Sequence, residues 1–249
     1  ADSEFSIGGG LAEARVLTAA RELLASDQTC ASIRIDLSGG ADSAGVCGGQ
    51  MQLALRLWRQ AELPRAEQIA SDLAAGRSVQ LLADELGAGA SAEWIEPDPR
   101  LLIVGGGHCG LALYQLARYL DFDIWIVDPH GEALDRERLA GAQLRRGDDL
   151  ALSEAVASDR ALYAVLLNRD FHSDVQTLRA IAGARFAYLG MMGSRRRIAT
   201  VLAELTPEQS AQLGALKAPV GIEIGAQSPH EIAVSILAEL IRVRAQSGQ

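Results

Sequence analysis

The sequence predicts an α/β protein with a doubly wound parallel sheet in its C-terminal part, preceded by a small α+β domain. Short apolar runs alternate with helical patterns through the second half of the chain, the order typical of a parallel sheet covered by helices. Apolar residues make up 49% of the 249 residues and aromatic residues only 4%, which favours helices packed on a sheet over a sandwich or barrel.

A proline-containing segment, EPDPR at residues 96–100, separates the two halves. Pro97 and Pro99 both forbid a continuing helix and favour an extended linker. We therefore expect one domain over residues 1–96 and a second over residues 100–249.

The first half combines helical and strand patterns. Residues 11–24 have apolar side chains at helical spacing, and residues 33–37 and 51–58 alternate with period two, which predicts a hairpin around a long glycine-rich tip. Residues 64–76 predict a helix with proline in its first turn and glycine at its end, and residues 91–96 a further strand.

The second half predicts regular alternation of strands and helices. The strands are expected at residues 101–104, 123–128, 161–167 and 185–190, and the helices at 108–120, 132–140 (polar), 174–182, 194–204 and 229–245.

The turn after the first of these strands fits a dinucleotide-binding pattern. Gly105, Gly107 and Gly110 have the spacing G-x-G-x-x-G, which permits a tight turn, a close approach of the backbone to a pyrophosphate, and close packing of helix on strand. The helix that begins near His108 would direct its free N–H groups at the phosphate. Asp128 ends the second strand, where a carboxylate bonds ribose hydroxyls and favours NAD over its 2′-phosphorylated form. These features predict a Rossmann-like domain; a structural turn without a ligand is the alternative.

A second candidate anion site lies in the segment GSRRR. Gly193 and Ser194 open a helix with Ser194 as its N-cap, and Arg195 and Arg196 supply charged donors. The alternative is an ordinary helix start with a solvated basic face.

Charge and cysteine content limit the function classes. A net charge of −9 argues against a general nucleic-acid binder or a protein of anionic membranes, and no apolar run is long enough to span a bilayer. Cys30, Cys47 and Cys109 are widely spaced, which argues against a disulfide framework or zinc site and fits reduced thiols in the cytoplasm.

The sequence shows no obvious catalytic set. His108 and His130 belong to the glycine turn and to the loop after the second strand; His172 and His230 are the catalytic candidates, although each also fits an ordinary polar position near a helix start. Cys47 lies among glycines in AGVCGGQ, where an accessible thiol is a candidate nucleophile or soft ligand; a small buried cysteine is the alternative.

Four segments together resemble one family, the xanthine dehydrogenase accessory proteins of the XdhC/CoxI type. They are SIGGGLAEARVLTAARELL (6–24), GVCGGQMQL (45–53), YLGMMGSRRR (188–197) and PVGIEIGAQSPHEIAVSILAELI (219–241), of which the last is the most specific. The resemblance covers nearly the whole chain.

The resemblance implies a maturation chaperone that is not itself catalytic. Such a factor binds the molybdenum cofactor in its molybdopterin form, protects it, supports its sulfuration and delivers it to a molybdenum hydroxylase such as xanthine dehydrogenase, with a cysteine-desulfurase-type enzyme as sulfur donor. Cys47 would contact the cofactor, with its molybdenum as a candidate partner. The other cofactor-binding positions implied are Gly8, Gly9, Gly10, Glu13, Gly48 and Gly49 in the first domain and Gly105, Gly107, Gly110, Gly193, Ser194 and Arg195 in the second. Asp128 and Arg196, predicted above from their positions and charges, complete the set of candidate cofactor-binding residues.

Two points remain open on the sequence alone. An NAD-dependent oxidoreductase, or a regulatory protein that senses a nucleotide, would use the same Rossmann-like domain, and the apolar final helix fits a homodimer as well as core burial. Many family members carry Thr-His-Asp after the third Rossmann strand, where this chain has Asn168, Arg169 and Asp170. A role for that histidine is therefore not transferred.

Overall fold

The computed structural model of the chain describes residue 7 and residues 10–40, 43–45, 48–87, 89–131, 134–147 and 149–247. Cys47, Gly8 and Gly9, which the sequence singles out, lie outside the described residues. The chain divides into two compact units, Ala1–Glu96 and Pro97–Gln249.

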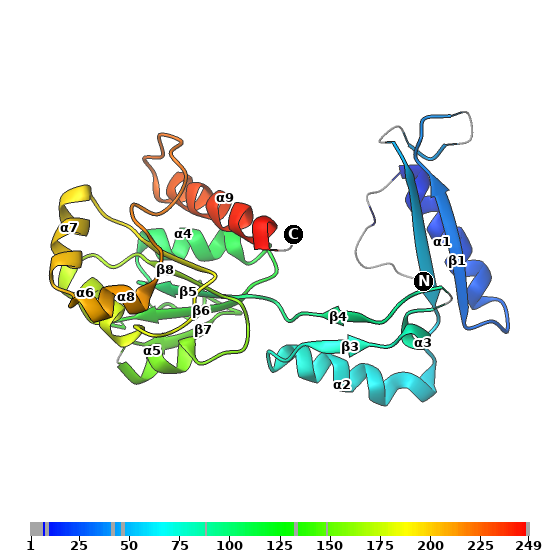
Figure 1. The fold of residues 1–249 in the computed structure, drawn as a ribbon, viewed down its shortest axis with the longest axis horizontal. Helices are drawn as coiled ribbons and strands as arrows, with labels where there is room; N and C mark the ends of the chain where they lie inside the picture. The colour runs from blue at the N-terminus through cyan, green and yellow to red at the C-terminus, as the bar shows by residue number, and fades with distance from the viewer. Residues whose placement is uncertain are drawn as a thin grey trace. The chain divides into compact units, whose positions relative to one another are not determined.

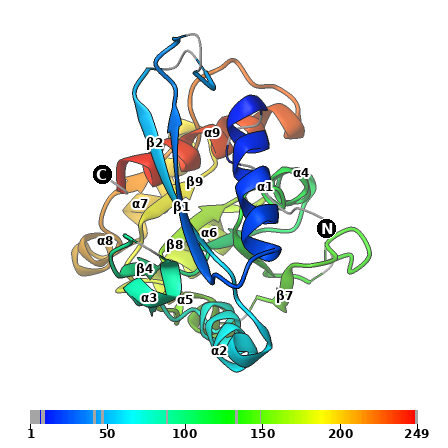
Figure 2. The ribbon, with the colours of Figure 1, turned by 90° about the vertical axis from the view of Figure 1, so that its right-hand side faces the viewer.

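The first unit contains a helix packed along a β-hairpin (Figure 2). Helix α1 (Gly10–Leu24) lies against strands β1 (Cys30–Asp36) and β2 (Gln50–Arg56), which pair antiparallel with Ile33 opposite Leu53. Along most of each strand, more exposed side chains alternate with less exposed ones, as expected when successive residues face opposite sides of the hairpin. This confirms the predicted helix and hairpin.

The rest of the first unit consists of short elements. A 3-10 turn (Gln60–Glu62) leads into α2 (Leu63–Ala74), and β3 (Val79–Leu81) pairs antiparallel with β4 (Glu93–Ile95) around α3 (Ala83–Leu86). The predicted helix at 64–76 and strand at 91–96 are confirmed. Strand β3 and helix α3 were not predicted, because three or four residues carry too little periodicity.

The second unit is built on a parallel sheet. Its strands are β5 (Arg100–Val104), β6 (Asp123–Asp128), β7 (Gln143–Arg146), β8 (Leu162–Leu166), β9 (Tyr188–Met191) and β10 (Leu216–Lys217). They lie in the order β10-β9-β8-β5-β6-β7, every pair parallel. This is the doubly wound Rossmann order, and the chain reverses its direction of winding between β5 and β8. The predicted fold class is confirmed.

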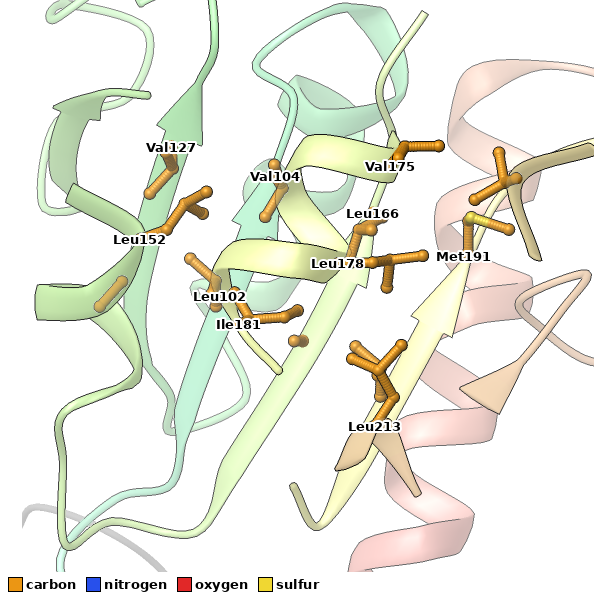
Figure 3. Packing of buried hydrophobic residues seen from close by; sticks show 14 of the residues in the cluster. Leu102, Val104, Val127, Leu152, Leu166, Val175, Leu178, Ile181, Met191 and Leu213 are labelled. Atoms are coloured by element: carbon orange, nitrogen blue, oxygen red, sulfur yellow. The ribbon is translucent and has the colours of Figure 1, made fainter. Parts of the chain in front are cut away.

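Helices cover both faces of this sheet (Figure 1). Helices α4 (His108–Ala117) and α9 (Pro229–Ser247) lie side by side on one face, over Leu101 and Ile103 of β5. Helices α5 (Asp149–Val156), α6 (Phe171–Ala180), α7 (Arg195–Ala203) and α8 (Pro207–Leu213) pack on the other, over Leu102 and Val104. Figure 3 shows Leu152 of α5 and Leu178 of α6 in this layer. Because both faces are covered, β5 and β8 are almost continuously apolar.

One predicted helix is wrong. The polar helix expected near 132–140 is absent from the described residues 134–142, which form turns before β7. The Asp135 carboxylate accepts hydrogen bonds from the backbone N–H groups of Glu137 and Arg138, a local bond that competes with helix formation. Strands β7 and β10 and helices α5 and α8 were not predicted. No helix in the described part of the chain is both long and apolar enough to cross a membrane.

Candidate functional site

The glycine turn connects β5 to α4, and its geometry requires glycine at two of the three predicted positions, Gly105 and Gly110. Gly105 has a φ of +107°, and a Cβ there would lie 2.8 Å from the Leu167 carbonyl group. A Cβ on Gly110 would lie 2.0 Å from the Gly105 carbonyl oxygen, so only glycine lets the helix pack this closely on the strand. Gly107 is the N-cap of α4, and the N–H groups of the first helical turn beyond it have no carbonyl partner within the helix.

Asp128, at the end of β6, holds this turn in place. Its Oδ2 accepts a hydrogen bond from the Gly106 N–H at 2.8 Å, and its Oδ1 accepts from His130 and Gly131 at 3.1 and 2.8 Å. The residue is 8% exposed. Three backbone donors thus already occupy the side chain predicted to bind ribose, and its contact with a ribose stays a prediction.

A cavity of about 280 Å³ lies at the carboxyl ends of β5, β6 and β8. This is the point where the strand order reverses, the usual ligand position in a doubly wound sheet. Its lining combines the glycine turn, the end of β6 and the β8–α6 loop: Gly105, Gly107, Asp128, Pro129, His130, Leu167, Asn168, Arg169, Asp170 and Ser173. The glycines and Asp128 were predicted as site residues; the β8–α6 residues were not.

The third arginine of the GSRRR segment fixes the β8–α6 loop. The Arg197 guanidinium donates to Asp174 Oδ2 at 2.5 and 3.0 Å and to the carbonyl oxygens of Asn168, Arg169 and Asp170 at 2.9 Å each. Asp174 is fully buried. Its burial raises the pKa of its carboxyl above the usual value, an effect that the Arg197 charge and hydrogen bonds only partly offset. Arg197 is therefore a positioning residue for the cavity wall.

Asp170 and His130 face each other at the cavity. Asp170 caps α6 by accepting hydrogen bonds from the backbone N–H and the hydroxyl of Ser173 at 2.9 and 2.8 Å. His130 Nε2 lies 3.9 Å from Asp170 Oδ2. Burial acts to raise the pKa of Asp170, but the Ser173 bonds, with the charges of His130 and Arg197, outweigh it and lower that pKa.

The predicted catalytic histidines do not line this cavity. His172 stacks against Phe171, with ring centroids 3.9 Å apart, and His230 Nε2 lies 3.2 Å from Gln115 Oε1. The histidine at the cavity is His130, which sequence reasoning had placed only in a loop. Its position two residues after Asp128, at the end of a central strand, was the available signal.

The second predicted anion site stands apart from the cavity lining. Ser194 is the N-cap of α7, as predicted, and accepts a hydrogen bond from the Arg197 N–H at 3.3 Å. Arg195 and Arg196 are exposed, and neither they nor Gly193 line the cavity. Their role as anion ligands stays a prediction.

The described site residues of the first unit occupy two places. Gly10 and Glu13 lie in the first turn of α1. Gly48 and Gly49 close the β1–β2 ladder through two hydrogen bonds with Leu37, at 2.8 and 3.0 Å. Their contact with a cofactor stays a prediction, as it does for Cys47, Gly8 and Gly9 outside the described residues.

The long motif over residues 219–241 has a structural role. Buried Glu239 on α9 accepts hydrogen bonds from the Tyr188 hydroxyl and the Gly221 N–H, at 2.5 and 2.8 Å. Ser235 donates to the Ile222 carbonyl oxygen at 2.5 Å, and a Cβ on Gly221 would lie 2.4 Å from the Ser235 hydroxyl. These residues hold the segment before α9 against that helix.

Comparison with known proteins identifies the family. A family model described as the XdhC Rossmann domain matches residues 101–240, more than half of the chain. The chain belongs to the XdhC family. An uncharacterized Escherichia coli (strain K12) protein, YqeB, is 33% identical to this XdhC protein over 149 residues, 59% of this chain and 27% of the relative.

One further curated relative and one solved structure are similar to this chain. A Bacillus subtilis (strain 168) protein, named as a probable subunit of xanthine dehydrogenase, is 28% identical over 156 residues, 60% of this XdhC chain and 44% of the relative. The matches thus span less than half the length of either curated relative. A crystal structure of a xanthine dehydrogenase from Bacillus halodurans superposes with a TM-score of 0.78 at 19% identity, over 98% of this chain and 83% of that one, which shows a shared fold.

Proposed function

We propose that this XdhC protein is an accessory factor for a xanthine-dehydrogenase-like molybdenum hydroxylase, and that it binds the molybdenum cofactor as cargo. In this role it protects the cofactor, supports its sulfuration by a cysteine-desulfurase-type donor and delivers it to the hydroxylase. Family membership supports the link to xanthine dehydrogenase, since one relative carries that enzyme's name.

The observation that carries the proposal is the cavity on the glycine turn. A pterin cofactor ends in a phosphate, and an N-terminal helical turn behind a glycine N-cap is a favourable site for that group. Gly107 lines the cavity, and a Cβ there would lie 3.3 Å from the Arg169 guanidinium, so the glycine leaves room for that side chain beside the turn. The described residues therefore fit the phosphate end of the cofactor.

The soft contact to the cofactor is assigned to Cys47. None of the described cavity-lining residues is a cysteine. Cys109 lies near the start of α4, but burial raises the pKa of its thiol, which disfavours the thiolate that a metal would bind. Cys47, in its Cys-Gly-Gly segment, remains the candidate that family resemblance implies.

The test measures pterin in protein purified without oxygen from a molybdenum-replete host. The protein is denatured, the extract oxidised, and fluorescent pterin quantified per chain for wild type, Cys47→Ala and, as a matched cysteine control, Cys30→Ala. We expect near-stoichiometric pterin in wild type and Cys30→Ala and a clear loss in Cys47→Ala. No pterin in wild type, even after incubation with released cofactor, would contradict the proposal.

An NAD-dependent oxidoreductase is the second candidate, favoured by the Rossmann strand order and by the position of Asp128. The three backbone hydrogen bonds that Asp128 already accepts weigh against a ribose-binding role. Titration with NAD and NADH separates the two candidates: an oxidoreductase binds the dinucleotide and turns over a substrate whether or not Cys47 is present.

A further inference from the structure

The charges around the cavity leave one cation unmatched. Asp174 is paired with Arg197, Asp170 accepts from Ser173 and lies beside His130, and Asp128 accepts three backbone N–H groups. Arg169 is exposed, and no carboxylate of the described residues lies within ion-pair distance of its guanidinium. The cavity wall therefore carries a positive charge that no carboxylate of the described residues neutralises.

The position of this guanidinium is electrostatically unfavourable without a ligand. A Cβ on Gly107 would lie 3.3 Å from both Nε and Nη2 of Arg169, which places the cation against the N-cap of α4. The N-terminus of a helix is the positive end of its dipole. A guanidinium there meets a charge of its own sign, and an anion bound beside it would accept hydrogen bonds both from Arg169 and from the N–H groups of the first helical turn.

A buried amide oxygen in the same cavity also lacks a partner. Asn168 is 3% exposed and lines the cavity, and its Oδ1 accepts no hydrogen bond from any described residue. Its Nδ2 donates to Asp174 Oδ1 at 3.1 Å. Because Asp174 is the anionic partner of Arg197, the amide nitrogen faces that carboxylate and the oxygen stays free. A ligand with a hydrogen-bond donor beyond its anionic group would satisfy this oxygen.

The geometry points to Arg169 as the residue that binds the phosphate of the cavity's ligand, together with the first turn of α4. The ligand class is a phosphate or pyrophosphate ester whose remaining part donates a hydrogen bond, a description that a nucleotide and a pterin phosphate both meet. This inference rests on the proposed function in that both place a phosphate ester in this cavity. Arg169 suits the role because its planar fork bonds two phosphate oxygens at once.

Calorimetric titration of the full chain with inorganic pyrophosphate tests the inference. We expect wild type to bind pyrophosphate and Arg169→Ala to bind it at least about 10-fold more weakly, since charge-assisted hydrogen bonds are lost. Arg169→Lys keeps the charge without the fork and should fall between them. Arg185→Ala is the matched control. Arg185 is exposed and precedes β9, so it lies at the amino end of the parallel strands, whereas the cavity lies at their carboxyl end.

Further titrations identify the source of the phosphate. If ADP binds more tightly than pyrophosphate and adenosine does not bind, the ligand is a nucleotide; if pterin content falls in Arg169→Ala, it is the cofactor. A loss of ADP binding or of pterin content in Arg169→Ala supports the role of Arg169. Equal pyrophosphate affinity in Arg169→Ala and Arg185→Ala, or no binding by wild type, would overturn it.

The outcomes separate this inference from the proposed function. Arg169-dependent binding of pyrophosphate by a protein that never contains pterin leaves the inference standing and removes the accessory role. Conversely, the protein can contain stoichiometric pterin while neither its pterin content nor its pyrophosphate affinity changes in Arg169→Ala. That result leaves the accessory role standing and removes the inference about Arg169. Thermal unfolding of Arg169→Ala verifies that the exposed substitution leaves the fold intact.

Discussion

Replacing Arg197 by methionine removes the charge that neutralises Asp174 and the donors that hold the β8–α6 loop. Asp174 is fully buried, whereas the Arg197 side chain is 23% exposed. Breaking a buried ion pair by removing one partner costs about 3–5 kcal/mol, because the remaining charge is left uncompensated. Since water can reach part of the vacated space, we expect the lower end, about 3 kcal/mol.

This loss is large enough to measure by thermal or urea unfolding. For a domain of this size, 1 kcal/mol lowers the melting temperature by about 2–4 °C, so Arg197→Met should melt about 6–12 °C below wild type. Arg196→Met, its exposed neighbour on α7, is the control and should change the free energy of unfolding by less than about 0.5 kcal/mol. In an Asp174→Asn background the Arg197 substitution should cost clearly less, because no charge remains to be matched.

The pH dependence of the Arg197→Met penalty follows from the pKa of Asp174. Burial raises the folded-state pKa of this carboxyl above its unfolded value, so the folded state binds the proton more tightly. The stabilisation that comes from the protonated Asp174 carboxyl is complete below the pKa of this group in the unfolded state. It is lost as pH rises through the pKa of this group in the folded state. Without Arg197 the folded pKa rises further, so the penalty should be smaller at about pH 5 than at about pH 8. Equal stability of Arg197→Met and wild type, or the same penalty in the Asp174→Asn background, would refute this reasoning.

Two other predictions concern the glycine turn and the segment before α9. Gly110→Ala should lower the free energy of unfolding by more than about 3 kcal/mol, because its Cβ would overlap the Gly105 carbonyl oxygen. The Cβ of Gly107→Ala meets only the flexible end of Arg169, so this variant should lose about 1 kcal/mol and bind pyrophosphate more weakly. Urea unfolding and calorimetry of both variants check this, and an intact fold in Gly110→Ala would disprove it. Burial, and to a lesser extent the hydrogen bond and charge of Glu239, raise the pKa of the Tyr188 hydroxyl. The protonated hydroxyl therefore contributes its full stabilisation below about pH 10 and loses it at higher pH. Tyrosinate absorbance should show Tyr188 ionising only on unfolding, and a titration before unfolding that disappears in Tyr188→Phe would contradict this.

The glycine turn could be predicted from the sequence because its constraints are local. The spacing of Gly105, Gly107 and Gly110 after an apolar strand specifies the turn, the helix start and the close packing, and the observed geometry requires glycine at Gly105 and Gly110. The long strands and helices were likewise readable from their periodicity. Strand β10, with two residues, and the turns after β6, which Asp135 stabilises by local hydrogen bonds, offer no such period.

The β8–α6 wall of the cavity could not be predicted in the same way. That Asn168 and Arg169 lie beside the glycine turn depends on β8 pairing with β5, a contact between residues some 60 positions apart that no local pattern encodes. Arg197 did leave a signal. It precedes buried Val201 by four residues, so both lie on the inner face of α7, whereas Arg195 and Arg196 point to solvent.

In the proposed complex the ligand's phosphate lies on the glycine turn, beside the first turn of α4 and the Arg169 guanidinium. A crystal structure of the full chain with bound pyrophosphate tests this placement most directly. We predict density for the anion within hydrogen-bond distance of the first-turn N–H groups of α4 and of the Arg169 guanidinium. Density at the turn formed by Gly193, Ser194, Arg195 and Arg196 instead, with the carboxyl end of β5 empty, would contradict the account.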